Sequence, residues 1–69
     1  MGSLKDAEIS MVTTDNTANP PRVNVEAANV TVWRPIAEQS SFMVGDRLRG
    51  DYDDDYKLAT GYKVTSASM

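Results

Sequence analysis

Carboxylates are the side chains of this sequence that gather densely enough to suggest chemistry. Four aspartates fall within residues 51–55, the acidic segment: Asp51, Asp53, Asp54 and Asp55. Paired carboxylates can perform general acid and base catalysis where a walled cleft separates their pKa values. The 69 residues include no His and no Cys, and they hold too few apolar side chains to build such a cleft. We therefore expect no enzyme and no catalytic residue.

Alternate aspartates of the acidic segment also match the start of a calcium-binding loop. Asp51, Asp53 and Asp55 occupy the first three ligand positions of that motif, and on a strand they would share one face. The match then fails, because Tyr56 replaces the glycine of position six and Tyr62 the glutamate of position twelve. A solvated acidic surface explains the run more simply. We expect no metal and no cofactor, and leave calcium binding as an open alternative.

Interleaved positive charges weaken the idea that the acidic segment imitates nucleic-acid phosphates. Residues 41–69 carry five acidic and four basic side chains, a net charge of only −1. Such interleaving favours ion pairs within a sheet or between subunits. The alternative is a small acidic binding or inhibitor module that acts through the acidic segment. Without a basic patch interleaved with aromatic residues, we expect no direct binding to nucleic acid.

Arg49, Gly50 and Asp51 spell a tripeptide that resembles integrin-binding ligands. That chemistry needs a guanidinium and a carboxylate on opposite sides of a glycine turn. A glycine between charged residues is equally typical of any turn, so whether the tripeptide is functional stays open.

Aromatic and arginine side chains are the best candidates for binding a protein partner. Trp, Tyr and Arg dominate binding hot spots because they bury a large area at a small entropic cost. The alternative is that these residues form a small core around the tryptophan. We predict a partner-binding set of six residues: Trp33, Arg34, Phe42, Tyr52, Tyr56 and Tyr62.

The apolar content of the chain is low for an independently folded domain. Leu, Ile, Val and Phe make up 13 of 69 residues, just under the roughly 20% below which chains tend to be disordered. Disulfides and structural zinc, which stabilise many small domains, are excluded by the absence of Cys and His. We therefore expect the chain to be ordered by contacts with a larger protein assembly or within a homo-oligomer.

Local patterns divide the chain into three parts. Residues 1–12 are compatible with a short helix, because Ser3 and Asp6 could cap it and Leu4, Ala7 and Met11 recur at helical spacing. Residues 13–21 are rich in turn formers and predict an extended arm or linker. Residues 22–69 predict a small β region, with alternating valines over residues 22–33 as its clearest signal.

These observations predict a small, mainly β fold that is partly extended, with an irregular arm and a few short strands. The function they favour is a non-enzymatic structural or assembly protein that binds by strand addition. Short, Cys-free chains rich in Thr, Ser and Asn are typical of minor, cementing or accessory subunits of viral (phage) particles. We expect no membrane and no small-molecule substrate as partners. No signal peptide is apparent in residues 1–11, so we expect location in a virion or the cytoplasm.

Overall fold

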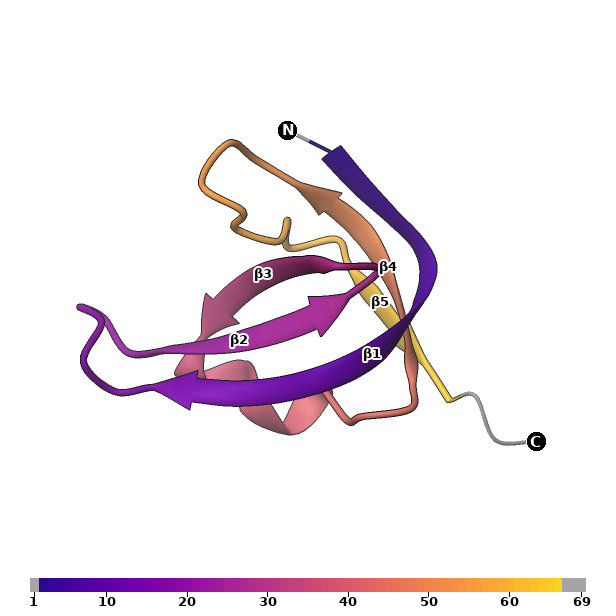
Figure 1. Cartoon of the computed structure of the whole chain (residues 1–69). Coiled ribbons are helices and arrows are strands. Elements are labelled where there is room, and N and C mark those ends of the chain that lie inside the picture. Colours follow the sequence, from indigo (N-terminus) through magenta and orange to yellow (C-terminus); the bar gives the residue numbers. More distant parts are fainter. Residues whose placement is uncertain (1, 67–69) are drawn as a thin grey trace.

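A computed structural model describes residues 2–66 and shows a mainly β chain with 57% of its residues in strands. All strand pairs are antiparallel, in the order β3-β2-β1-β4-β5 (Figure 1). The prediction of a mainly β fold is therefore confirmed. The elements are β1 (Gly2–Asp15), β2 (Arg22–Ala27), β3 (Val30–Pro35), the 3₁₀ helix η1 (Ile36–Ser41), β4 (Arg47–Tyr52) and β5 (Lys63–Thr65).

The long strand β1 replaces the helix predicted for residues 1–12, of which Met1 lies outside the described residues. Its first half pairs with β4 and its second half with β2, so β1 bends across the molecule (Figure 1). The helix prediction was wrong because two or three helical turns are weak alone, whereas pairing with β4 along one half and β2 along the other gives β1 main-chain hydrogen bonds over most of its length.

A β-bulge in β1 allows both Leu4 and Ile9 to be buried. Leu4 and Ile9 are five residues apart, so on an unbroken strand their side chains would face opposite sides of the sheet. The register shifts between Leu4 and Ala7, where Asp6 has a φ of 56°. The extra residue turns the strand, and both Leu4 and Ile9 are buried.

The hairpin of β2 and β3 follows the alternating valines. Val23, Val25 and Val32 are fully buried. Ala28 and Asn29 form the two-residue connection with φ values of 54° and 64°, the backbone of a type I′ turn. The strands predicted within residues 22–33 are therefore confirmed, and a tight turn at Ala28 and Asn29 joins them.

The extended arm predicted for residues 13–21 is instead the connection between β1 and β2. Its first three residues, 13–15, belong to β1, and residues 16–20 form a bend. The Asp15 carboxylate accepts hydrogen bonds from the Thr17 backbone N–H (2.9 Å), the Thr17 hydroxyl (2.6 Å) and the Ala18 N–H (3.2 Å). The turn-forming residues correctly indicated a lack of regular structure at residues 16–20. The segment is nevertheless not an extended arm, because β1 and β2 on either side of it pair with each other.

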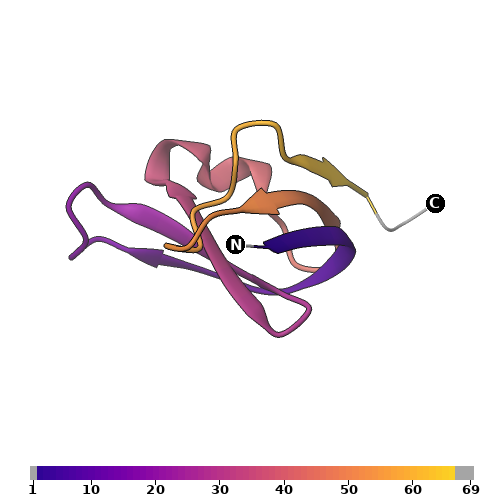
Figure 2. The same cartoon turned by 90° about the horizontal axis from the view of Figure 1, so that it is seen from above.

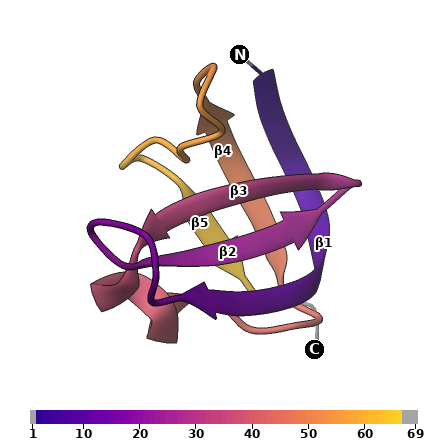
Figure 3. The same ribbon diagram turned by 60° about the vertical axis from the view of Figure 1, so that its left-hand side comes forward.

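Residues 56–58 close the strands into a small barrel. The Trp33 N–H donates to the Tyr56 carbonyl (3.1 Å) and the Leu58 N–H donates to the Trp33 carbonyl (3.1 Å). Leu58 also forms a bridge with Tyr52 at the end of β4. This segment therefore joins β3 to β4, and β2 and β3 cross in front of β4 and β5 (Figure 3).

The barrel encloses a core supplied by the chain itself. The radius of gyration is 11.0 Å, equal to the about 11 Å expected of a compact domain of this length, so the chain is less extended than predicted. β5 lies at the outer side of β4 (Figure 2). Ordering of residues 22–69 by a partner stays a prediction, and residues 67–69 lie outside the described part. The buried core residues are Leu4, Ile9, Val23, Val25, Ala27, Val32, Phe42, Leu48 and Leu58.

Within residues 2–66, no helix has the length and hydrophobicity needed to cross a bilayer.

Candidate partner-binding surface

The six residues predicted to bind a partner separate into two clusters. Arg34, Phe42 and Tyr62 form an inner cluster, in which Arg34 and Phe42 are each only 6% exposed. The outer cluster lies around residues 52–56 and the outward face of β3, and comprises Trp33, Tyr52 and Tyr56. Of the six, Tyr56 in the outer cluster is the most open to another molecule, being 51% exposed, whereas Trp33, Tyr52 and Tyr62 are half-buried.

The inner cluster connects η1 to the segment that contains Leu58 and Tyr62. The Arg34 guanidinium donates to the Leu58 carbonyl (2.9 Å) and forms an ion pair with Glu38 on η1. The Tyr62 hydroxyl donates to the same Glu38 carboxylate (2.7 Å), and its ring stacks on Phe42 at 5.1 Å between centroids. The prediction that Arg34 and Phe42 contact a partner is therefore corrected, because both are buried in the chain's own interior.

Electrostatics in the inner cluster agree with this structural role. Hydrogen bonds from Arg34 and Tyr62 lower the pKa of Glu38 below its ordinary value. The hydrogen bond to Glu38 raises the pKa of Arg34, and burial raises that of Tyr62. All three shifts favour a charged Arg34–Glu38 pair beside a neutral tyrosine.

Trp33 projects outward because the residues on either side of it in β3, Val32 and Arg34, point inward. Two cations lie close to its ring: the Arg22 guanidinium is 3.9 Å from the ring centroid and the Lys57 ammonium 5.3 Å. The indole N–H donates to the Asp55 carbonyl (3.0 Å). The ring is therefore held in place while remaining partly exposed.

Tyr56 is presented by a strained turn. It has a φ of 61°, a left-handed conformation that a bulky residue rarely adopts. The Asp53 carboxylate organises this turn by accepting from the N–H groups of Asp55 (2.9 Å) and Lys57 (3.0 Å). The Tyr56 ring stacks on Tyr52 at 5.5 Å, yet 51% of the residue is exposed.

The aspartates of the acidic segment do not line one strand face, because β4 ends at Tyr52 and the following residues turn. All four are exposed, and the Asp53 carboxylate also holds the turn. Among residues 2–66, no three acidic side chains lie close enough together to hold a metal ion. The shared face required by the calcium alternative is thus not formed.

The Arg49-Gly50-Asp51 tripeptide is part of strand β4 and not of a turn, contrary to the geometry that adhesion chemistry requires. Arg49 and Asp51 therefore lie on one face of the strand. A Cβ atom on Gly50 would stand 2.9 Å from the Cβ of Tyr62, so close strand packing accounts for this glycine.

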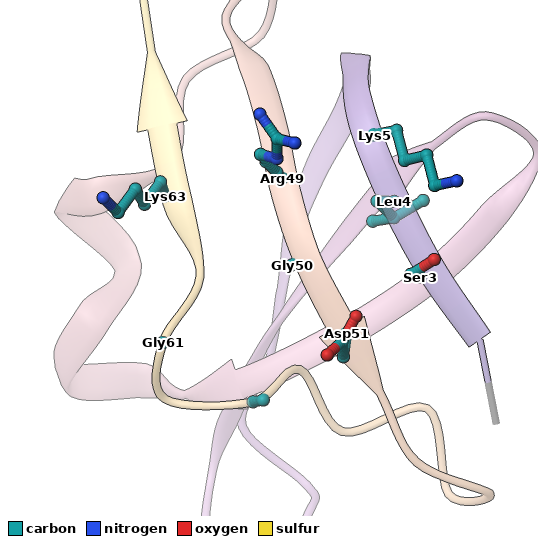
Figure 4. A pocket seen from close by; sticks show the side chains of 9 residues that line it. Ser3, Leu4, Lys5, Arg49, Gly50, Asp51, Gly61 and Lys63 are labelled. Carbon is teal, nitrogen blue, oxygen red and sulfur yellow. The ribbon is translucent and has the colours of Figure 1, made fainter.

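A shallow groove of about 460 Å³ lies over β1, β4 and the segment before β5 (Figure 4). Lys5, Arg49 and Lys63 stand across its upper part, with Ser3 and Asp51 below them in the view. Sequence patterns did not single out this group, since its members become neighbours only through strand pairing.

Arg22, Lys57 and Glu38 are further residues that sequence reasoning missed. Arg22 and Lys57 flank Trp33, and Glu38 joins Arg34 to Tyr62. One signal was available: Glu38 lies four residues after Arg34, a spacing at which side chains meet on a helical turn. The contacts with Trp33 depend on the β2–β3 register and on residues 56–58.

Comparisons of this chain with protein-family models, curated proteins and solved structures give no match.

Proposed function

We propose that this chain is a non-enzymatic structural or assembly protein that binds a larger protein through its outer cluster. The observation that carries the proposal is Tyr56, whose aromatic ring is half exposed while its backbone is strained. A residue that served only to fill the core would be buried, and a residue that served only to make the turn would be Gly or Asn. Strain at a surface aromatic instead supports a role in binding.

The surroundings of Tyr56 support binding to a protein. Tyr52 stacks on its ring, and Trp33 is contacted by Arg22, Lys57 and the Asp55 carbonyl. Rigid aromatic side chains bury a large area without losing much conformational entropy on binding. The outer cluster thus combines preorganised aromatic surface with flanking positive charge.

Strand addition at β5 is the second contact that we propose. β5 is the last strand in the order, and within residues 2–66 no strand pairs with its outer edge. An extended segment of a partner would gain main-chain hydrogen bonds there. Together with the Cys-free, Thr-, Ser- and Asn-rich composition, this supports the accessory subunit of a viral particle as the proposed setting.

The proposal is tested with a photo-crosslinking amino acid at position 56 and, as a control, at position 31, where Thr31 is exposed on the same strand as Trp33. We expect one protein of the native assembly to be captured from position 56 only. With that protein purified, Trp33→Ala should weaken binding by roughly tenfold or more, and Thr31→Ala by less than about twofold. Equal effects of the two substitutions would refute the role of the outer cluster.

The alternative, an inhibitor acting through the acidic segment, predicts a different response. Reversing the charge of Asp55 should then abolish binding, and added salt should weaken it strongly. The structure favours the assembly role because the Asp53 carboxylate is already engaged by two backbone N–H groups.

A further inference from the structure

Three cationic side chains line the groove over β1, β4 and β5. Arg49 on β4 lies directly opposite Lys63 on β5, and Lys5 follows Leu4, the β1 residue that pairs with Gly50. All three cationic residues are exposed, and their side chains come from three neighbouring strands (Figure 4). Like charges directly opposite each other destabilise a sheet, so the stability of the fold does not account for this row.

The positive charge of the groove is not neutralised within the chain. Of the described residues that line it, Asp51 alone is acidic, so three cations face one carboxylate. Within residues 2–66, Lys5, Arg49 and Lys63 form no ion pair. A hollow surface with such an excess of one sign of charge attracts a ligand of the opposite sign. The groove therefore favours an acidic ligand.

A second observation in the same groove indicates that this ligand is a polypeptide. Gly61 lines the groove, but no atom of residues 2–66 lies within 4 Å of a Cβ added there. Its backbone does not have the left-handed conformation that favours glycine, in contrast to Gly45 with a φ of 98°. Neither packing nor conformation in the described chain therefore requires glycine at position 61. Glycine beside a strand often marks a site where another backbone approaches closely.

We propose that the groove binds an extended acidic segment of another protein, with acidic residues at alternate positions. The three cations belong to strands about 4.8 Å apart, so their row spans about 10 Å. Alternate side chains of an extended segment lie on one side of it about 7 Å apart. Two carboxylates therefore match the width of the row, while the backbone of the segment passes against Gly61.

Other occupants fit the groove less well. Nucleic acid binds through many phosphates and through stacking on aromatic rings, whereas this groove has three cations beside Asp51 and no aromatic residue among those that line it. A single phosphate ion needs donors that converge on one point, but these cations are spread over three strands. The acidic segment of a second copy is a turn held by its own Asp53, and not an extended chain.

The groove continues towards the outer cluster. An adjoining hollow of about 510 Å³ shares Asp51 and Ala59 with the groove and is lined by Tyr52 and Lys57. The Tyr52 ring in turn stacks on that of Tyr56. One partner can therefore contact both surfaces. That the acidic segment belongs to the partner of the outer cluster rests on the proposed function, whereas binding of an acidic segment in the groove does not.

Binding is tested by NMR titration of the isotope-labelled full chain with a short peptide of alternating Glu and Thr. A peptide of alternating Gln and Thr is the matched control. We expect amide shifts centred on the groove, with an affinity at least about tenfold lower for the Gln peptide and for the Glu peptide when salt rises from about 20 mM to about 0.5 M. Absence of shifts at low salt up to millimolar peptide, or shifts centred elsewhere, overturns the proposal.

Charge substitutions at about 0.15 M salt, where distant charges are screened, test the row of cations. The double variant R49Q/K63Q should weaken binding of the Glu peptide at least about fivefold, and Asp51→Asn should strengthen it about twofold. Arg47→Gln is the control and should change the affinity less than about twofold, because Arg47 lies outside the groove and donates to the Asp6 carbonyl. Equal effects of the double variant and the control overturn the proposal.

Gly61→Ala tests the close approach of a backbone. The added Cβ meets nothing in the described chain, so the thermal melt should be unchanged while binding of the Glu peptide weakens about threefold or more. Unchanged binding would overturn the extended segment as the ligand. R49Q/K63Q removes a like-charge pair and should also melt cooperatively. The peptide and salt titrations of the unchanged chain need no substitution and stand by themselves.

Further titrations separate the groove from the outer cluster and from other ligands. Trp33→Ala should leave the affinity for the Glu peptide within about twofold, because Trp33 lines neither the groove nor the adjoining hollow. Loss of capture from position 56 with retained peptide binding would refute the proposed function and not the groove. Tighter binding of a short oligothymidine, equal binding of inorganic phosphate, or self-association through the groove would each assign it to another ligand and overturn the proposal.

Discussion

The inner and outer clusters are built from the same kinds of residue but have different environments. Trp33 and Arg34 are adjacent in β3, yet the tryptophan faces outward and the arginine lies in the interior. In the inner cluster, every polar group of Arg34 that is described finds a carbonyl or carboxylate. In the outer cluster, the rings also have partners, but Trp33 stays partly exposed and Tyr56 is 51% exposed. Residue type alone therefore does not distinguish a binding residue from a structural one.

Removing the centre of the inner cluster should have the largest effect on stability. Arg34→Ala leaves the Leu58 carbonyl and the Glu38 carboxylate without their main donor, at an expected cost of about 2–3 kcal/mol in the free energy of unfolding. Urea denaturation measures the difference. The exposed Arg49→Ala is the matched control and should change stability by less than about 0.5 kcal/mol. Equal costs would mean that the buried network contributes no more than a surface arginine.

Gly50→Ala should have the second-largest effect on stability, because its added Cβ would clash with Tyr62 of the inner cluster. The added Cβ would lie 2.9 Å from the Tyr62 Cβ and 3.1 Å from its backbone Cα, neither of which can move freely. We expect a loss of about 1–3 kcal/mol in a urea or thermal melt. Gly61→Ala is the control, since nothing lies within 4 Å of its added Cβ. A neutral Gly50→Ala would show that the strand and Tyr62 separate easily.

Acid should weaken the inner cluster in a way that depends on Glu38. Because the folded state lowers the pKa of Glu38, its contribution is present above the ordinary value of 4.5 and is lost as pH falls through the lowered pKa. The stability difference between the unchanged chain and Glu38→Gln should therefore shrink below about pH 4.5. Asp15, whose pKa is also lowered, titrates in both proteins and cancels. A difference that is constant with pH would contradict the assignment.

Substitutions in the outer cluster should change the free energy of unfolding least. Tyr56→Asn relieves the left-handed backbone but loses the stacking on Tyr52, two opposing effects of about 1 kcal/mol each. We expect the free energy of unfolding to change by less than about 0.5 kcal/mol, while binding of the partner captured at position 56 is lost. If Tyr56→Asn unfolds the protein as Arg34→Ala does, the distinction between the clusters fails.

Part of this division was predictable from alternation in the strands. The buried valines at positions 23, 25 and 32 set the inward face of the hairpin, and the same period of two carries Arg34 inward and Trp33 outward. The position of Tyr62 could not be predicted in this way, since its contacts with Phe42 and Glu38 join segments about 20 residues apart. The helix expected at residues 1–12 failed for a related reason, because pairing with β2 and β4 outweighs local spacing.

The sequence by itself determined the β character, the strands within residues 22–33 and the absence of disulfide chemistry, because these depend on neighbouring residues or on composition. Only the tertiary structure decided which aromatic residues are exposed, how β1 serves two partner strands and which charges share the face of β4. Those properties arise from contacts between distant segments, and many pairings are compatible with the same local preferences.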